Sequence, residues 1–379
     1  MEGLKSADII PYLKGESLDH NILKNFRPVS NLQVIGKIVE RVVHERLNNH
    51  LNINNLNIPH QSAYKKNNST ETLLVRFTND ILLASDSKNA TVVLLLDLSA
   101  AFDTVDHNLL LTILEKEIGL HGTVLKWFKS FLTSRSQRTR LNNNISEEIY
   151  IMFGVPQGSV LGPVLFNIYI RSIYALVKSM GFSIFGYADD HQVLKQIVAK
   201  NQHVCLIEDL SLCFHKIKQW MTWYFLFLNG DKTQIIVCGP PDILSEIEIH
   251  GIFLDDNIVI RFISTVKNLG ILMDSTLTMQ NQVSEIKKES FSTLTKIGKI
   301  KFLLSKDHLT TIVNSMVICC LDYCNALYYG IGQKLLLQLQ QIQNAASKLI
   351  MGKTNMIVVL IMTSKLCTGS QLRRGLFLR

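Results

Sequence analysis

The chain has 379 residues, 47% of them hydrophobic, which excludes a disordered protein and is enough for two or three domains. The formal net charge is +8, and residues 275–379 hold 13 Lys and Arg against 4 Asp and Glu, so the rest of the chain is almost neutral. A basic C-terminal part suits a protein that grips a phosphate backbone, although a merely solubilising surface would give the same count. Seven irregularly spaced cysteines without a CxxC pair argue against a disulfide framework and favour an intracellular protein.

The first half of the chain alternates between predicted helices and short strands. Residues 1–25 show no clear periodicity. Apolar spacing predicts a helix over 35–51, and a second helix is expected from an N-cap at Ser69 or Thr70 to about residue 84. Thr91–Asp97 is a β-branched apolar run that predicts a buried strand ending on a carboxylate. The elements expected next are helices over 106–117 and 121–133 and strands over 136–141 and 147–153, with a turn at 142–144.

The second half begins with an uncharged run between Glu148 and Arg171. Its glycines, prolines and amides predict a loop that leads into a buried helix over 161–180, not a membrane span. Short strands over 183–187 and 191–194 are expected to flank a hairpin turn. The remaining expected elements are a helix over 201–227, strands over 233–238 and 266–272, and helices over 278–302, 307–322 and 333–350. This order predicts an α+β domain with helices on an antiparallel sheet, followed by a separate all-α module.

Three carboxylates lie at the ends of predicted strands: Asp97, Asp189 and Asp190. Neighbouring strands of one sheet could bring them within a few Å of one another. Clustered carboxylates repel and stay ionised when cations neutralise them, and hard oxygen ligands select Mg²⁺ or Mn²⁺. Two such ions could activate an attacking hydroxyl and stabilise a leaving pyrophosphate. The alternative is that these aspartates are ordinary turn and cap residues.

The surrounding motifs favour the chemical interpretation. Tyr187–Asp190 resembles the YxDD box of reverse transcriptases, and the other motifs follow in the order of the LINE-type (non-LTR), jockey-like group over about residues 7–350. The stretches that carry the resemblance are Asn25–Ser30 and Gln61–Thr72 for the fingers, Leu94–Asp103 and Gly154–Pro163 for the first two palm motifs, Lys232–Thr233 and Asn268–Gly270 for the later ones, and Leu339–Ala346 for the thumb.

The resemblance implies an α+β right-hand polymerase. Residues 1–24 would be an upstream extension, 25–274 the fingers and palm, and 275–352 a basic helical thumb. The family pattern stops after Gly352, so residues 353–379 are expected to be a degenerate tail.

The resemblance also implies roles for individual residues. Asp97, Asp189, Asp190 and the backbone carbonyl of Leu98 would hold two Mg²⁺ ions, with Mn²⁺ as a substitute. Phe102 would be the steric gate that excludes a ribose 2′-hydroxyl, unless it is a plain core residue. The other expected nucleotide-binding residues are Arg27, Lys37, Lys65, Gln157, Gly158 and Lys232, and the expected primer or template contacts are Tyr187, Leu269 and Gly270. For Arg27, Lys37 and Lys232 the alternative is an ordinary solvated charge.

The expected activity is RNA-directed DNA synthesis: extension of a DNA primer on an RNA template with deoxynucleoside triphosphates, without a membrane. The family implies work in the nucleus and cytoplasm. Two departures stand against the pattern: Ala63-Tyr64-Lys65 replaces Gly-Phe-Arg, which loses bidentate phosphate geometry, and His191 replaces a small hydroxyl residue. The first alternative is a catalytically inert nucleic-acid-binding remnant of the same element, and the second is a polymerase that makes RNA.

Overall fold

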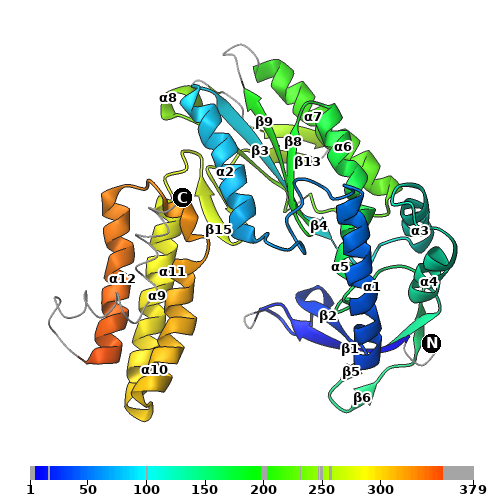
Figure 1. The fold of residues 1–379 in the computed structure, drawn as a ribbon. Coiled ribbons are helices and arrows are strands. Elements are labelled where there is room, and N and C mark those ends of the chain that lie inside the picture. Colours follow the sequence, from blue (N-terminus) through cyan, green and yellow to red (C-terminus); the bar gives the residue numbers. More distant parts are fainter. Residues whose placement is uncertain are drawn as a thin grey trace.

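The computed structural model describes residues 5–352 except 16–17, 100, 198–202, 231, 246, 248–250 and 256–257. The predicted tail lies outside these residues. A central sheet occupies the upper part of the molecule in Figure 1. An N-terminal sheet lies below it on the right of the view, and a C-terminal group of helices lies below it on the left.

The central sheet has the strand order β11-β3-β9-β8, and all its pairs are antiparallel. Its strands are β11 (Gln234–Cys238), β3 (Ala90–Leu96), β9 (Asp190–Ile197) and β8 (Ser183–Tyr187). Successive side chains of a strand point to opposite faces. In β3, Val92 and Leu94 therefore enter one hydrophobic core and Val93 enters another. The predicted antiparallel sheet with helices packed on it is confirmed.

The first core, which we call the outer core, contains Leu110, Phe166 and Ile217 from the helices that cover one face of the sheet. These helices are α3 (His107–Lys116), α4 (Gly122–Leu132), α5 (Gly162–Tyr169), α6 (Arg171–Ser179) and α7 (His203–Trp223). Two predictions need correction here. The expected helix over 161–180 is broken at Ile170, and the expected helix over 201–227 ends at Trp223. Among the described residues, no helix is both long and apolar enough to cross a bilayer.

The chain after α7 cannot continue as a helix because Phe225 has a φ of 53°. It then forms β10 (Phe227–Leu228), which pairs with β4 (Leu98–Ser99) directly after the end of β3. This short pairing brings the segment that carries Lys232 back to the end of β3.

The second core, the inner core, joins the other face of the sheet to the C-terminal helices. Phe77, Val93, Phe185, Val283 and Ile342 all belong to it. The elements that contribute are α2 (Thr70–Asp86), β14 (Thr265–Asn268), β15 (Ile271–Asp274), α9 (Gln280–Ile300), α10 (Lys306–Val313), a π-helical turn (Asn314–Ile318), α11 (Cys319–Asp322) and α12 (Gln333–Met351). The helical module predicted as separate therefore shares its core with the central sheet.

Two local features of this side follow from the sequence. Ser69 and Thr72 form a capping box at the start of α2, which confirms the predicted N-cap. The strand expected over 266–272 is instead the hairpin β14–β15, because Leu269 and Gly270 have φ values of 46° and 87° and form its two-residue turn.

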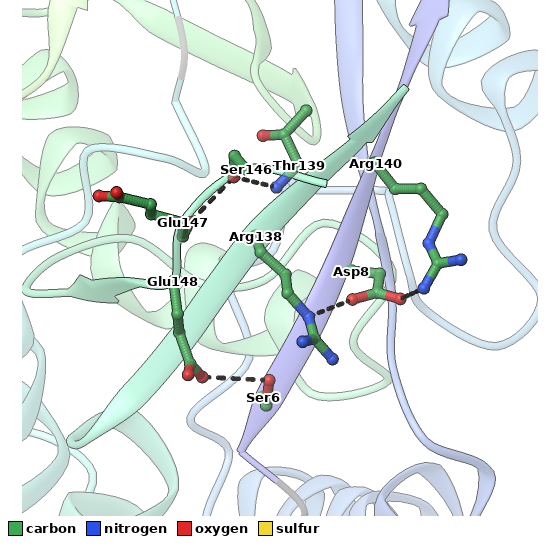
Figure 2. A network of polar contacts seen from close by, with 8 residues as sticks. All are labelled: Ser6, Asp8, Arg138, Thr139, Arg140, Ser146, Glu147 and Glu148. Atoms are coloured by element: carbon green, nitrogen blue, oxygen red, sulfur yellow. Dashed lines mark hydrogen bonds and ion pairs between the residues drawn. The ribbon is translucent and has the colours of Figure 1, made fainter. Parts of the chain in front are cut away.

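The N-terminal sheet contains a strand in a region where no element was expected. β1 (Ser6–Leu13) pairs with β2 (Phe26–Asn31) and with β5 (Arg135–Leu141). The carboxylate of Asp8 lies 3.0 Å from both Arg138 and Arg140, which project from the same side of β5 (Figure 2). The hydrogen bond from Arg138 is the main cause that lowers the pKa of Asp8.

The remaining elements complete these layers. α1 (Val34–Ile53) confirms the first predicted helix, and β6 (Asn144–Ile145) and β7 (Ile149–Ile151) pair with β5 around the predicted turn. A short helix, α8 (Pro241–Leu244), and a hairpin of β12 (Gly251–Asp255) and β13 (Ile258–Arg261) were not predicted.

Candidate active site

Four of the predicted site residues line up across one end of the central sheet. β3 and β9 pair Leu96 with His191, so the same register puts Asp97 opposite Asp190. Asp190 pairs with Tyr187 on the next strand. On the other side of Asp97, Lys232 Nζ lies 3.6 Å from the Asp97 carboxylate. Adjacent strands are about 4.8 Å apart, so Lys232, Asp97, Asp190 and Tyr187 form one row, which we call the carboxylate row.

Burial and the neighbouring negative charges both act on the two hairpin aspartates. Burial raises the pKa of Asp189, and the charge of Asp97 raises it further. Burial, followed by the charges of Asp189 and Asp97, raises the pKa of Asp190 to about 6. Arg27, on β2, acts in the opposite direction and lowers the pKa of Asp189. The central sheet thus gathers negative charge that a cation would relieve, and the charge of Arg27 from the N-terminal sheet offsets part of it.

These oxygens suit a hard divalent cation, although they do not form a closed set of ligands. Within the described ranges, no group of three His, Cys, Asp or Glu side chains meets closely enough to hold a metal ion. Leu98, whose carbonyl was the fourth expected ligand, lies in β4 and has a buried side chain. Carboxylate and carbonyl oxygens are the ligands that Mg²⁺ and Mn²⁺ prefer.

The hairpin turn that carries Asp189 is held by Gln61, which the motif reading did not assign to the site. The Gln61 side chain accepts a hydrogen bond from the Ala188 N–H and donates one to the Ala188 carbonyl, both at 3.1 Å. Ala188 has a φ of 58°, so this backbone conformation needs support. His191 adds a contact of 3.0 Å between its Nδ1 and the Asp189 carbonyl. The signal for Gln61 was weak because its partners are backbone groups far along the chain.

The loop after Gly154 is tied to the N-terminal sheet. The Gln157 side chain donates to both carboxylate oxygens of Asp103, at 2.9 and 2.8 Å. The backbone carbonyl of Gln157 accepts a hydrogen bond from the Ser30 N–H. Gly158 has a φ of 113°, and a Cβ added to it would lie 2.9 Å from the Ser30 carbonyl oxygen. A glycine was expected where backbone approaches a ligand, and in the structure the group that approaches is Ser30.

Glu40 in α1 holds the same loop through hydrogen bonds. It was not predicted as a site residue. Its carboxylate accepts hydrogen bonds from the Ser159 hydroxyl at 2.6 Å, from the Val160 N–H at 2.7 Å and from the Leu161 N–H at 3.2 Å. Glu40 is buried, so these charge-assisted bonds fix the loop against α1.

The predicted gate, Phe102, lies between the interior and the surface. Its ring stacks on that of Phe166 with centroids 4.6 Å apart, and the side chain is half-buried against the outer core. The ring of Phe102 therefore packs on the core through Phe166, as a core residue would, and keeps part of its surface exposed, as a gate would.

The two remaining predicted cations, Lys37 and Lys65, have different surroundings. Lys37 lies in the first turns of α1 and is half-buried. The Lys65 ammonium donates to the carbonyl of Ile58, and burial lowers its pKa to about 8. In the structure the Lys65 ammonium is therefore bound to a backbone oxygen beside α1.

The β14–β15 turn lies beside the carboxylate row. A cavity of about 90 Å³ is lined by Asp97, Asp190 and Lys232 together with Lys267 and Leu269 of the hairpin. Leu269, expected to contact primer or template, is thus close to the row. Lys267 is a second cation there that the motif reading missed.

Comparison with known proteins identifies related sequences. Residues 14–294 match the family model described as "Reverse transcriptase (RNA-dependent DNA polymerase)". The "Probable RNA-directed DNA polymerase from transposon BS" of Drosophila melanogaster is 27% identical over 76% of this chain and 31% of its own length. The "RNA-directed DNA polymerase from mobile element jockey" of the same organism is 28% identical over 87% of this chain and 36% of its own length. The chain thus spans about a third of these relatives.

Solved structures with a similar arrangement include "apo telomerase from Candida Tropicalis truncated from C-terminal domain". The TM-score is 0.48 at 12% identity, over 72% of this chain and 54% of that chain. The telomerase of the same organism in complex with a fragment of telomeric RNA has a TM-score of 0.46 at 12% identity, over 99% of this chain and 64% of that chain.

Proposed function

We propose that this chain, which belongs to the reverse transcriptase (RNA-dependent DNA polymerase) family and resembles its jockey-like LINE members, extends the 3′-hydroxyl of a DNA primer on an RNA template. The substrates would be deoxynucleoside triphosphates. The observation that carries the proposal is the carboxylate row, because it joins Asp97 to Asp190 across one sheet end with Lys232 beside them.

Asp97, Asp189 and Asp190, with the carbonyl of Leu98, are the residues that would hold two Mg²⁺ ions. Bound cations would supply charge neutralisation and polarise the hydroxyl and phosphate oxygens. The protein's own part would be positioning and electrostatic stabilisation. Lys232 would face the leaving phosphates. Arg27, whose charge already acts on Asp189, would approach the triphosphate from the N-terminal sheet. Tyr187 would lie near the primer end.

The test is primer extension on a homopolymer RNA template by wild type and by Asp189→Asn. The variant should lose extension by about a hundred- to thousandfold, because removal of one electrostatic group from a preorganised site costs that much. Template binding, measured by fluorescence anisotropy with a labelled RNA–DNA duplex, should stay within about twofold. Asp86→Asn, at the far end of α2, is the matched control and should behave as wild type.

The outcomes separate the proposal from its alternatives. A wild-type protein that binds the duplex without extending it in Mg²⁺ or Mn²⁺ would be an inert remnant. Extension with ribonucleotides as efficient as with deoxynucleotides would make the protein a polymerase that synthesises RNA. Equal loss of binding and extension in Asp189→Asn would contradict the metal-binding role of this residue.

A further inference from the structure

The connection between α11 and α12 touches the turn that lies beside the carboxylate row. Tyr323 immediately follows α11, and its hydroxyl donates a hydrogen bond of 2.7 Å to the carbonyl of Leu269. Its ring also covers the neighbouring residue, because a Cβ added at Gly270 would lie 3.4 Å from the ring. The C-terminal helices thus hold the β14–β15 turn by one polar and one packing contact.

The same connection is anchored to α2 a few residues later. The Ala326 N–H donates to the Glu71 carboxylate at 3.1 Å, and the Cys324 thiol lies 3.8 Å from the Thr70 hydroxyl. Tyr328, which is fully buried, and Leu327 belong to the inner core. Residues 323–328 therefore form a strap, fixed to the start of α2 at one end and to the β14–β15 turn at the other.

The turn needs an external support because of its own backbone. Leu269 has a φ of 46°, a conformation that a branched residue rarely adopts without help from its surroundings. Leu269 lines the same cavity as Asp97 and Asp190, so a shift of the turn would change the space beside the carboxylates.

We infer that Tyr323 is a positioning residue that holds the Leu269–Gly270 turn against the carboxylate row, so that the C-terminal helices set where the primer end lies. The inference rests on the proposed function, since it takes the turn as a primer contact. It goes beyond that function by assigning a role to a residue outside every motif of the sequence. Tyr323 acts through Leu269 and touches no substrate.

The test compares Tyr323→Phe with Tyr329→Phe, which removes a hydroxyl six residues away from a side chain that is 70% exposed. Tyr323→Phe should raise the primer–template concentration for half-maximal extension by about three- to tenfold, the size that loss of one hydrogen bond predicts. It should leave the KM for deoxynucleotides unchanged. Tyr329→Phe should match wild type in both.

A second measurement does not depend on catalysis. Hydrogen exchange at the amides of residues 268–271 should be faster in Tyr323→Phe than in wild type or Tyr329→Phe, while the amides of β3 and β9 should not change. If wild type extends no primer, the proposed function fails. If wild type extends and the two variants are alike in primer dependence and in exchange, or if the deoxynucleotide KM rises equally, the role of Tyr323 is overturned.

Discussion

One side chain, that of Gln61, satisfies both backbone groups of Ala188, with two hydrogen bonds of 3.1 Å. Gln61 is 1% exposed and also accepts from the Ala63 N–H at 3.1 Å. It joins the segment after α1 to the turn that presents Asp189. We therefore expect the geometry of the carboxylate row to depend on a residue that carries no charge.

Gln61→Leu keeps the volume but leaves three backbone groups without their side-chain partner. The free energy of unfolding should fall by about 2–4 kcal/mol, since each buried group left unsatisfied costs about 1–3 kcal/mol and the structure relaxes in part. Primer extension should fall by more than tenfold at a temperature where the variant is folded. Urea denaturation and extension assays would measure both. Gln333→Leu, at the exposed start of α12, is the control; a Gln61→Leu protein as stable as this control would contradict the expected role.

Glu40→Gln should weaken the loop that contains Gln157 and Gly158. An amide oxygen accepts weaker hydrogen bonds than a carboxylate, and Glu40 accepts three. The free energy of unfolding should therefore fall by about 1–3 kcal/mol. Because the loop is the expected nucleotide contact, the KM for deoxynucleotides should rise more than kcat falls. Glu45→Gln, an exposed position of the same helix, supplies the comparison in steady-state kinetics. A change in kcat alone would show that Glu40 does not act through nucleotide binding.

Phe102→Val tests the gate against the core reading. Removal of the ring should reduce discrimination against ribonucleotides roughly ten- to hundredfold, as expected when a pocket loses a bulky wall. The lost stack on Phe166 should also cost about 1 kcal/mol of stability. Phe166→Leu breaks the same stack from the fully buried side and should lower stability without changing nucleotide choice. Competition between ribo- and deoxynucleotides decides between the two interpretations. If Phe102→Val selects nucleotides as wild type does, Phe102 is a core residue and no gate.

His191 should make the folded state sensitive to acid. Burial lowers the pKa of His191 from 6.5 to about 4, so below pH 6.5 the unfolded chain takes up a proton that the folded protein excludes. The contribution of neutral His191 to the free energy of unfolding is complete above pH 6.5. It is lost as the pH falls towards 4, and the total loss is up to about 3 kcal/mol.

The measurement is the urea midpoint between pH 7 and pH 4 for wild type and His191→Asn, which retains a donor for the Asp189 carbonyl. The variant should lose less stability on acidification than wild type. His121→Asn, at the exposed start of α4, should follow wild type. Parallel pH curves for wild type and His191→Asn would refute the prediction.

Much of the fold was predictable where local patterns are strong. The apolar run ending at Asp97, the hairpin around Asp189 and the capping box at Ser69 were each recognisable from neighbouring residues. β1 was not, because its sequence contains a proline and no clean alternation, and because one of its two partner strands, β5, lies some 130 residues away. Long-range pairing of this kind leaves no periodic signal.

The candidate site divides in the same way. Asp97, Asp190, Tyr187 and Lys232 could be assigned from motifs, and the sheet register accounts for their proximity. Gln61, Glu40 and Tyr323 could not, since each acts on backbone groups, and a hydrogen bond to a distant carbonyl or N–H requires no particular residue at the partner position.

The inner core has a practical consequence for anyone who shortens this protein. A chain ending at residue 274 would lose Val283, Ile342 and their neighbours, and it would expose the parts of α2 and of the β14–β15 hairpin that pack on the removed elements. An apolar face of that extent promotes self-association. The C-terminal helices are therefore part of the folding unit of the sheet, and heating should melt both in a single cooperative transition.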